Sequence, residues 1–132
     1  MSKLLDFLIE NPVDGITETF TLTDRIPFKF TIRPFTSDEI DEIRKKCKMK
    51  INPKTKDVDI DMKKLKELVC VECTLDPVFN DAEACKKAGC TNGRELLKKV
   101  LAGGEIDTLY ERIGLLSGYG RDINEEVEKA KN

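Results

Sequence analysis

The segment IPFKFTIRPFTSDEIDEIRKKC, residues 26–47, predicts a β-strand, a break and an amphipathic α-helix in one continuous run. Phe28, Phe30 and Ile32 alternate with polar residues, as in a strand that buries one face, so all three side chains are expected to point inward. Pro34 has no backbone N–H and biases the preceding residue toward extended geometry. The strand is therefore expected to end at about Arg33.

The helix that follows is marked by its N-cap. Thr36 and Glu39 stand three positions apart, the spacing of a capping box, in which each side chain bonds the backbone N–H of the other residue. Ile40, Ile43 and Cys47 then fall on one helical face. We expect this face to pack against the apolar side of the strand.

A second β-rich run, TETFTL at residues 17–22, precedes this strand. Residues 23–27 connect the two runs, which predicts an antiparallel hairpin with a loop of about 3–5 residues and with Phe20 on the apolar face. Because a lone hairpin is only marginally stable, helices must cover one of its faces.

Helical periodicity and capping residues predict the other elements, and residues 50–61 are expected to form a polar loop. A short helix is expected at residues 3–10. A helix at residues 61–74 is expected to bury an inner stripe that consists of Leu65, Leu68, Val69, Glu72 and Cys73. Three more are expected at residues 81–89, from Thr91 or Asn92 onward, and at residues 105–117. A last, highly charged helix is expected to start at Asp122.

Glycine and asparagine residues set the expected ends of these helices. Asn80 is the expected N-cap of the helix at residues 81–89, and Gly89 ends it. The pair Gly103 and Gly104 is expected to close the next helix, and Gly118 the one after it.

The chain length of 132 residues favours one domain. The expected architecture is α+β and mainly helical, with an N-terminal helix and β-hairpin in about residues 1–35 and helices in about residues 36–132. The formal net charge is −2 and the charges are interspersed, so nucleic acid is not an expected partner. Neither a membrane-length apolar run nor a signal peptide is present, and we expect a cytoplasmic protein.

Catalytic motifs are missing from the sequence. The chain has no histidine, which removes Ser-His, Cys-His and His-metal arrangements. It has no Walker-type loop and no G-x-G-x-x-G motif. The many carboxylates are interleaved with lysines, as on solvated helix faces. We therefore expect a protein that is not an enzyme and that uses no cofactor.

The five cysteines allow three interpretations: a zinc site, a redox Cys-x-x-C motif and structural thiols. The redox motif at Cys70 and Cys73 is disfavoured, because no thioredoxin-like βαβ pattern surrounds it. Cys70, Cys73, Cys85 and Cys90 form two pairs that could bind a structural zinc ion, as in a small regulatory or adaptor module. The first pair, however, lies within a helical pattern, and the second pair is more widely spaced than in a zinc knuckle. We prefer reduced structural thiols without a metal, with Cys73 in the core.

Two blocks of the sequence, residues 26–47 and 106–132, resemble the tail assembly chaperones of long-tailed phages and prophages, in the XkdN-like group. Together they cover somewhat more than a third of the chain, and residues 70–90 match nothing in the family pattern. The order of the matching residues carries the resemblance: Pro27, Phe28, Ile32, Arg33, Pro34, Glu39, Ile40, Gly118, Tyr119, Val127, Lys131 and Asn132.

The resemblance implies a non-catalytic chaperone that binds the hydrophobic tape-measure protein and helps recruit tail-tube subunits. It would act in the host cell cytoplasm and be absent from the mature virion. An amphipathic groove could cover exposed helices of such a client. The candidate partner-binding residues are Leu109, Ile113, Leu116 and Tyr119; the alternative is that they belong to the core.

The resemblance also implies that the protein is made in two lengths by a ribosomal frameshift. If Ala130, Lys131 and Asn132 have A-rich codons, the RNA contains A-AAA-AA(C/U), on which both tRNAs can slip back one nucleotide. The present chain would then be the short form, and a longer form would recruit tube subunits. The alternative is that Lys131 merely suits the dipole at a helix end.

Overall fold

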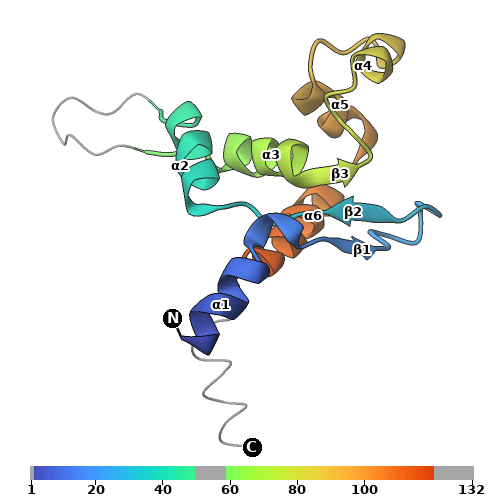
Figure 1. The fold of residues 1–132 in the computed structure, drawn as a ribbon. Helices are drawn as coiled ribbons and strands as arrows, with labels where there is room; N and C mark the ends of the chain where they lie inside the picture. Colours follow the sequence, from blue (N-terminus) through green and yellow to red (C-terminus); the bar gives the residue numbers. More distant parts are fainter. Residues whose placement is uncertain (1, 50–58, 121–132) are drawn as a thin grey trace, which may run out of the picture.

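The computed structural model describes residues 2–49 and 59–120 and has an α+β fold, as expected (Figure 1). The expected helix from Asp122, the frameshift residues and most of the loop at residues 50–61 lie outside the described residues. The elements are α1 (Lys3–Glu10), the 3-10 helix η1 (Val13–Gly15), β1 (Glu18–Phe20), β2 (Phe30–Ile32), α2 (Ser37–Lys46), α3 (Met62–Cys73), β3 (Thr74–Asp76), α4 (Ala82–Ala88), α5 (Gly93–Val100) and α6 (Gly103–Leu116).

The predicted hairpin is present as part of a larger sheet. β1 and β2 pair antiparallel, with Phe20 opposite Phe30 and Glu18 opposite Ile32. A third strand, β3, pairs antiparallel with the other edge of β2, so the sheet order is β1-β2-β3. The sequence analysis missed β3 because it is three residues long and follows α3 without a loop.

The expected inward position of Phe28 is wrong, since this side chain is 78% exposed, whereas Phe30 is 5% exposed. The strand begins only at Phe30, and the connection from β1 is longer than expected. Thr23 and Arg25 in this connection bond the carboxylate of Glu105 in α6. We attribute the short strand to this anchor, which holds the loop on α6 instead of extending the ladder.

α2 confirms the local prediction. Thr36 Oγ1 accepts from the Glu39 backbone N–H over 3.3 Å, and the Glu39 carboxylate accepts from the Thr36 N–H over 3.2 Å. Ile40, Ile43 and Cys47 are buried in the same core cluster as the apolar side of the sheet. The acidic first turn and basic last turn also suit the helix dipole.

α3 is the central helix, because it packs against α2, α5 and α6. The predicted stripe is right for Leu65, Val69 and Cys73, which are buried, but wrong for Glu72, which is exposed. The buried acidic residue is instead Glu67, which faces α5. Its carboxylate accepts from Arg94 Nε over 2.7 Å, so a cation from the neighbouring helix compensates its burial.

Two expected helix ends are wrong. Asp81, not Asn80, caps α4, because Asp81 Oδ1 accepts from the Ala84 backbone N–H over 3.0 Å. Gly103 and Gly104 do not close α5; they form the first turn of α6. α5 ends at Val100, and the chain turns before a new helix begins, since the Glu105 carboxylate accepts from the Ala102 N–H over 2.8 Å. Gly89 and Asn92 cap their helices as expected.

Candidate binding surface

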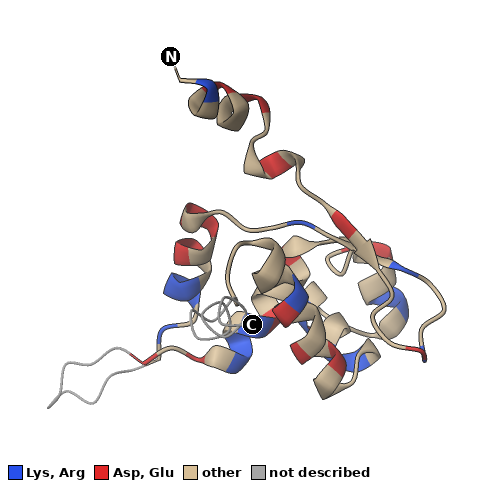
Figure 2. Ribbon diagram, turned by 90° about the horizontal axis from the view of Figure 1, so that it is seen from below, with Lys and Arg blue, Asp and Glu red and all other residues tan. Residues whose placement is uncertain are grey.

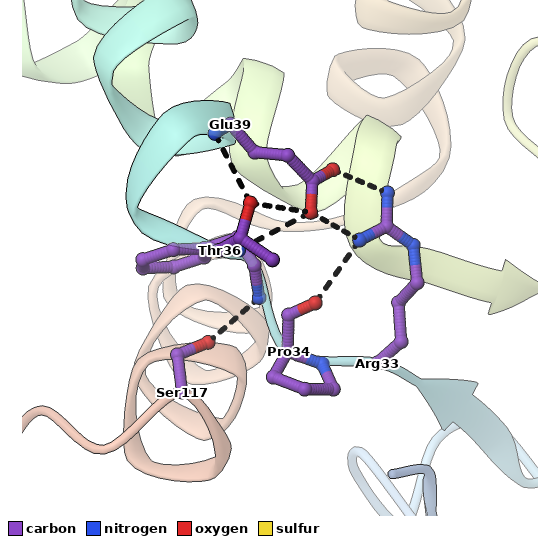
Figure 3. Close-up of polar contacts among 6 residues, drawn as sticks. Arg33, Pro34, Thr36, Glu39 and Ser117 are labelled. Carbon is purple, nitrogen blue, oxygen red and sulfur yellow. Dashed lines mark hydrogen bonds and ion pairs between the residues drawn. The ribbon is translucent and has the colours of Figure 1, made fainter. Parts of the chain in front are cut away.

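Arg33 and Glu39 join the end of β2 to the start of α2. Arg33 Nη1 and Nη2 donate to the two carboxylate oxygens of Glu39 over 3.0 and 2.9 Å, and Nη1 also donates to the Pro34 carbonyl over 3.0 Å (Figure 3). The hydrogen bonds from Arg33 lower the pKa of the Glu39 carboxyl below its ordinary value. One carboxylate therefore caps α2 and fixes the loop that leads into it.

The same loop is fixed to the end of α6. The Phe35 backbone N–H donates to Ser117 Oγ over 3.0 Å (Figure 3). This hydroxyl donates in turn to the Ile113 carbonyl over 2.7 Å. Gly118 has a left-handed φ of 93°, which favours glycine, and the chain turns there. Tyr119 then lies against Phe35, with ring centroids 5.5 Å apart.

A groove of about 420 Å³ lies beside this ring pair. Its lining comes from α2, α3 and α6, and α3 packs against both other helices, so α3 forms the floor. Ile40, Leu65, Tyr110 and Leu115 give the groove an apolar surface. Gly114 lies on the α6 wall, where a Cβ atom would meet no heavy atom within 4 Å. The missing side chain therefore leaves the groove open.

Charged side chains border this groove. Arg44 is on the α2 wall and Glu111 is on the α6 wall, while Lys66 Nζ and Asp107 Oδ1 form an ion pair over 3.4 Å. Over the described residues as a whole, Figure 2 shows Lys and Arg interspersed with Asp and Glu. The groove thus combines an apolar interior with charged edges: Arg44 on the α2 side, which pairs with Asp41 over 3.4 Å, and Glu111 on the α6 side.

The four residues predicted from the sequence to bind a partner have different positions. Leu109 and Ile113 are 0% exposed and belong to the core of the domain. Leu116 is half-buried, and Tyr119 is 52% exposed at the end of the groove. Partner binding by this set stays a prediction. In it, Tyr119 could contact the partner directly, while Leu109 and Ile113 could only support the surface from within.

The sequence analysis did not foresee that α1 would stand apart from the domain. None of the residues of α1 is buried, and Figure 2 shows the helix away from the other helices and the sheet. Its five apolar side chains are 45–69% exposed: Leu4, Leu5, Phe7, Leu8 and Ile9. One sequence signal could have indicated this exposed apolar surface: five of the eight residues of α1 are large and apolar, which is more than a solvated helix needs.

The cysteines do not form a shared site. Cys70 and Cys73 are buried in α3, Cys85 Sγ donates to the Phe79 carbonyl over 3.3 Å, and Cys90 follows α4. Within the described residues, no group of three or more His, Cys, Asp or Glu side chains is arranged to hold a metal ion. Burial raises the pKa of Cys70 and raises that of Cys73 to about 12, so both thiols stay protonated near neutral pH.

An α+β domain with an apolar groove and an unpacked amphipathic helix has the features of a protein-binding module. The family model for phage XkdN-like tail assembly chaperone proteins matches residues 4–131, and the chain therefore belongs to this family. This result confirms the resemblance found in the sequence. Tail assembly chaperones are a non-catalytic kind of protein that acts with tail components. No helix in residues 2–49 or 59–120 combines the length and apolar character needed to cross a membrane.

The fold is similar to that of one solved structure. The crystal structure of the protein yqbn has 21% sequence identity with this chain, and the match covers 91% of this chain and 99% of that one, with a TM-score of 0.69. At this identity the likeness supports the fold alone. The comparison with curated proteins gave no match.

Proposed function

We propose that this protein binds helical segments of the tape-measure protein in the host cell cytoplasm, helps recruit tail-tube subunits, and is left out of the finished virion. The groove between α2 and α6 is the observation that carries this proposal. A tape-measure protein is long and hydrophobic, and its helices would aggregate before the tube encloses them. An apolar groove can cover one face of such a helix, in the helix-in-groove mode of recognition.

The groove is also held in a shape that suits this role. The bonds from Arg33 to Glu39 and from Phe35 to Ser117 fix one end of it before any client binds. A preformed groove loses little conformational freedom on binding, so more of the apolar contact contributes to affinity.

A second apolar area supports contact with tube subunits. Phe28, in the loop before β2, and Val100, at the end of α5, are both exposed. They border one depression together with Pro77, which follows β3, and this depression is separate from the groove. We call this area the Phe28 patch. Two separate surfaces would allow one chaperone to contact the tape-measure protein and a tube subunit at the same time.

Co-expression with the tape-measure protein and the tube protein from the same phage genome tests the proposal. Gly114→Leu places a side chain in the groove and should reduce the amount of soluble tape-measure protein that co-purifies, while tube protein is still bound. Gly104→Leu is the matched control, because Gly104 also has free space around its Cβ position but lies outside the groove.

Phe28→Ser should have the opposite selectivity, with loss of tube protein and retention of tape-measure protein. The proposal would be refuted if the unchanged chain failed to keep the tape-measure protein soluble. Equal recovery of this client with Gly114→Leu and Gly104→Leu would remove the groove from the mechanism.

A further inference from the structure

The apolar surface of α1 has no cover in the described chain. A helix of eight residues is not stable by itself in water, so α1 needs a surface that buries its apolar side chains. At about 100° per residue, the arc from Phe7 through Leu4 and Leu8 to Leu5 and Ile9 spans about 200° of the circumference. A flat surface covers less than this, and α1 therefore fits a groove.

The groove between α2 and α6 matches α1 in length and chemistry. Eight residues at about 1.5 Å each give about 12 Å, and the part of α6 that lines the groove, from Asp107 to Leu115, is one residue longer and gives a similar rise of about 13.5 Å. The groove interior is apolar, and Gly114 leaves space in it for a side chain from outside. The same molecule thus carries an uncovered apolar helix and an open apolar groove.

We propose that α1 docks in the groove of a second copy of this chain, so that copies associate when no client is present. Residues that follow α1 favour a second copy over the molecule's own groove. Val13 and Ile16 line a neighbouring depression together with Phe35 and Tyr119, the ring pair at one end of the groove. Pro12 is extended, so α1 runs away from the domain, and an internal contact would need a reversal of the chain there.

The charges select one orientation of the docked helix. When the apolar arc of α1 faces the groove, the polar stripe faces out, with Asp6 at one edge and with Lys3 and Glu10 close together toward the other. The groove has Arg44 on the α2 wall and Glu111 on the α6 wall. Placing Asp6 beside Arg44 pairs opposite charges, while Lys3 and Glu10 together give the other edge no net charge. Turning α1 end for end would instead place Asp6 beside Glu111, which pairs like charges.

Light scattering on the purified full chain, across a wide range of protein concentration and without client, tests this association. The unchanged chain should reach at least twice its 15.0 kDa monomer mass as its concentration rises. Leu8→Glu in α1 and Gly114→Leu in the groove should each give the monomer mass. Val78→Glu is the matched control, because Val78 is an exposed apolar residue outside both surfaces, and it should associate like the unchanged chain.

Mixing the two monomeric variants identifies the occupant. The Leu8→Glu chain keeps an open groove and the Gly114→Leu chain keeps an intact α1, so their mixture should form a complex of one copy of each. Asp6→Arg should weaken the association of the chain, and Asp6→Arg with Arg44→Glu should restore it.

Two results would overturn the proposal: a monomeric unchanged chain at every concentration, or association that Leu8→Glu and Gly114→Leu leave intact. A monomer at every concentration is also the result expected if the chain's own α1 or its own residues 121–132 fill the groove. Since these measurements contain no tape-measure protein, their failure would leave the proposed client binding untouched.

Discussion

Replacement of Phe30 by alanine tests the centre of the fold. Phe30 is 5% exposed and shares the apolar side of the sheet with Phe20 and Ile32. Truncation of a buried phenylalanine costs about 3–5 kcal/mol, because contacts are lost and a cavity remains. Domains of this size have total stabilities of about 5–15 kcal/mol, so Phe30→Ala should remove a large fraction of the free energy of unfolding.

Thermal and urea denaturation, followed by circular dichroism, measure this loss, since the chain has no tryptophan to report by fluorescence. For a domain of this length, each 1 kcal/mol lowers Tm by roughly 3–5 °C, which gives a decrease of about 9–25 °C for Phe30→Ala. The urea midpoint should fall in parallel with an unchanged slope if the variant still unfolds in one step.

Phe28→Ala is the matched control, with the same chemistry two residues earlier in the chain. Phe28 is exposed, and its loss should change the free energy of unfolding by no more than about 0.5 kcal/mol. The reasoning would be refuted if Phe28→Ala destabilised the protein as much as Phe30→Ala. Phe28 would then be buried on the same face of the strand as Phe30, as the alternation in the sequence alone suggested.

Three further predictions concern buried polar groups and thiols. Arg94→Ala leaves the buried carboxylate of Glu67 without its cation and should cost about 3 kcal/mol in urea denaturation; an unchanged midpoint would contradict this. Hydrogen bonds, first from Arg25, lower the pKa of Glu105 to about 2 from an ordinary 4.5. This carboxylate therefore stabilises the fold above about pH 4.5, and acid titration should show its contribution lost as the pH falls toward 2, with less change in Arg25→Ala. In native alkylation at pH 8, Cys90 should react first, and the four buried thiols should react only after unfolding, with no zinc found by elemental analysis.

The sequence by itself determined the elements whose signals are local. The capping box of Thr36 and Glu39 needs only residues three positions apart, so α2 was predicted from its start to its buried face. The helical character of α1 and the pairing of β1 with β2 were predictable for the same reason. Local bonds and periodicity act over a few residues and depend little on the rest of the chain.

Only the tertiary structure decided which of these surfaces are covered. Phe28 has the parity of a buried residue, but the bonds from Thr23 and Arg25 to Glu105, about 80 positions later, hold its loop away from the sheet. The sequence placed Glu72 on the buried stripe of α3, but the buried carboxylate is that of Glu67, because α5 brings Arg94 against it. The groove likewise needs α2, α3 and α6 together. Burial depends on which distant segments meet, and no pattern within a single segment carries that information.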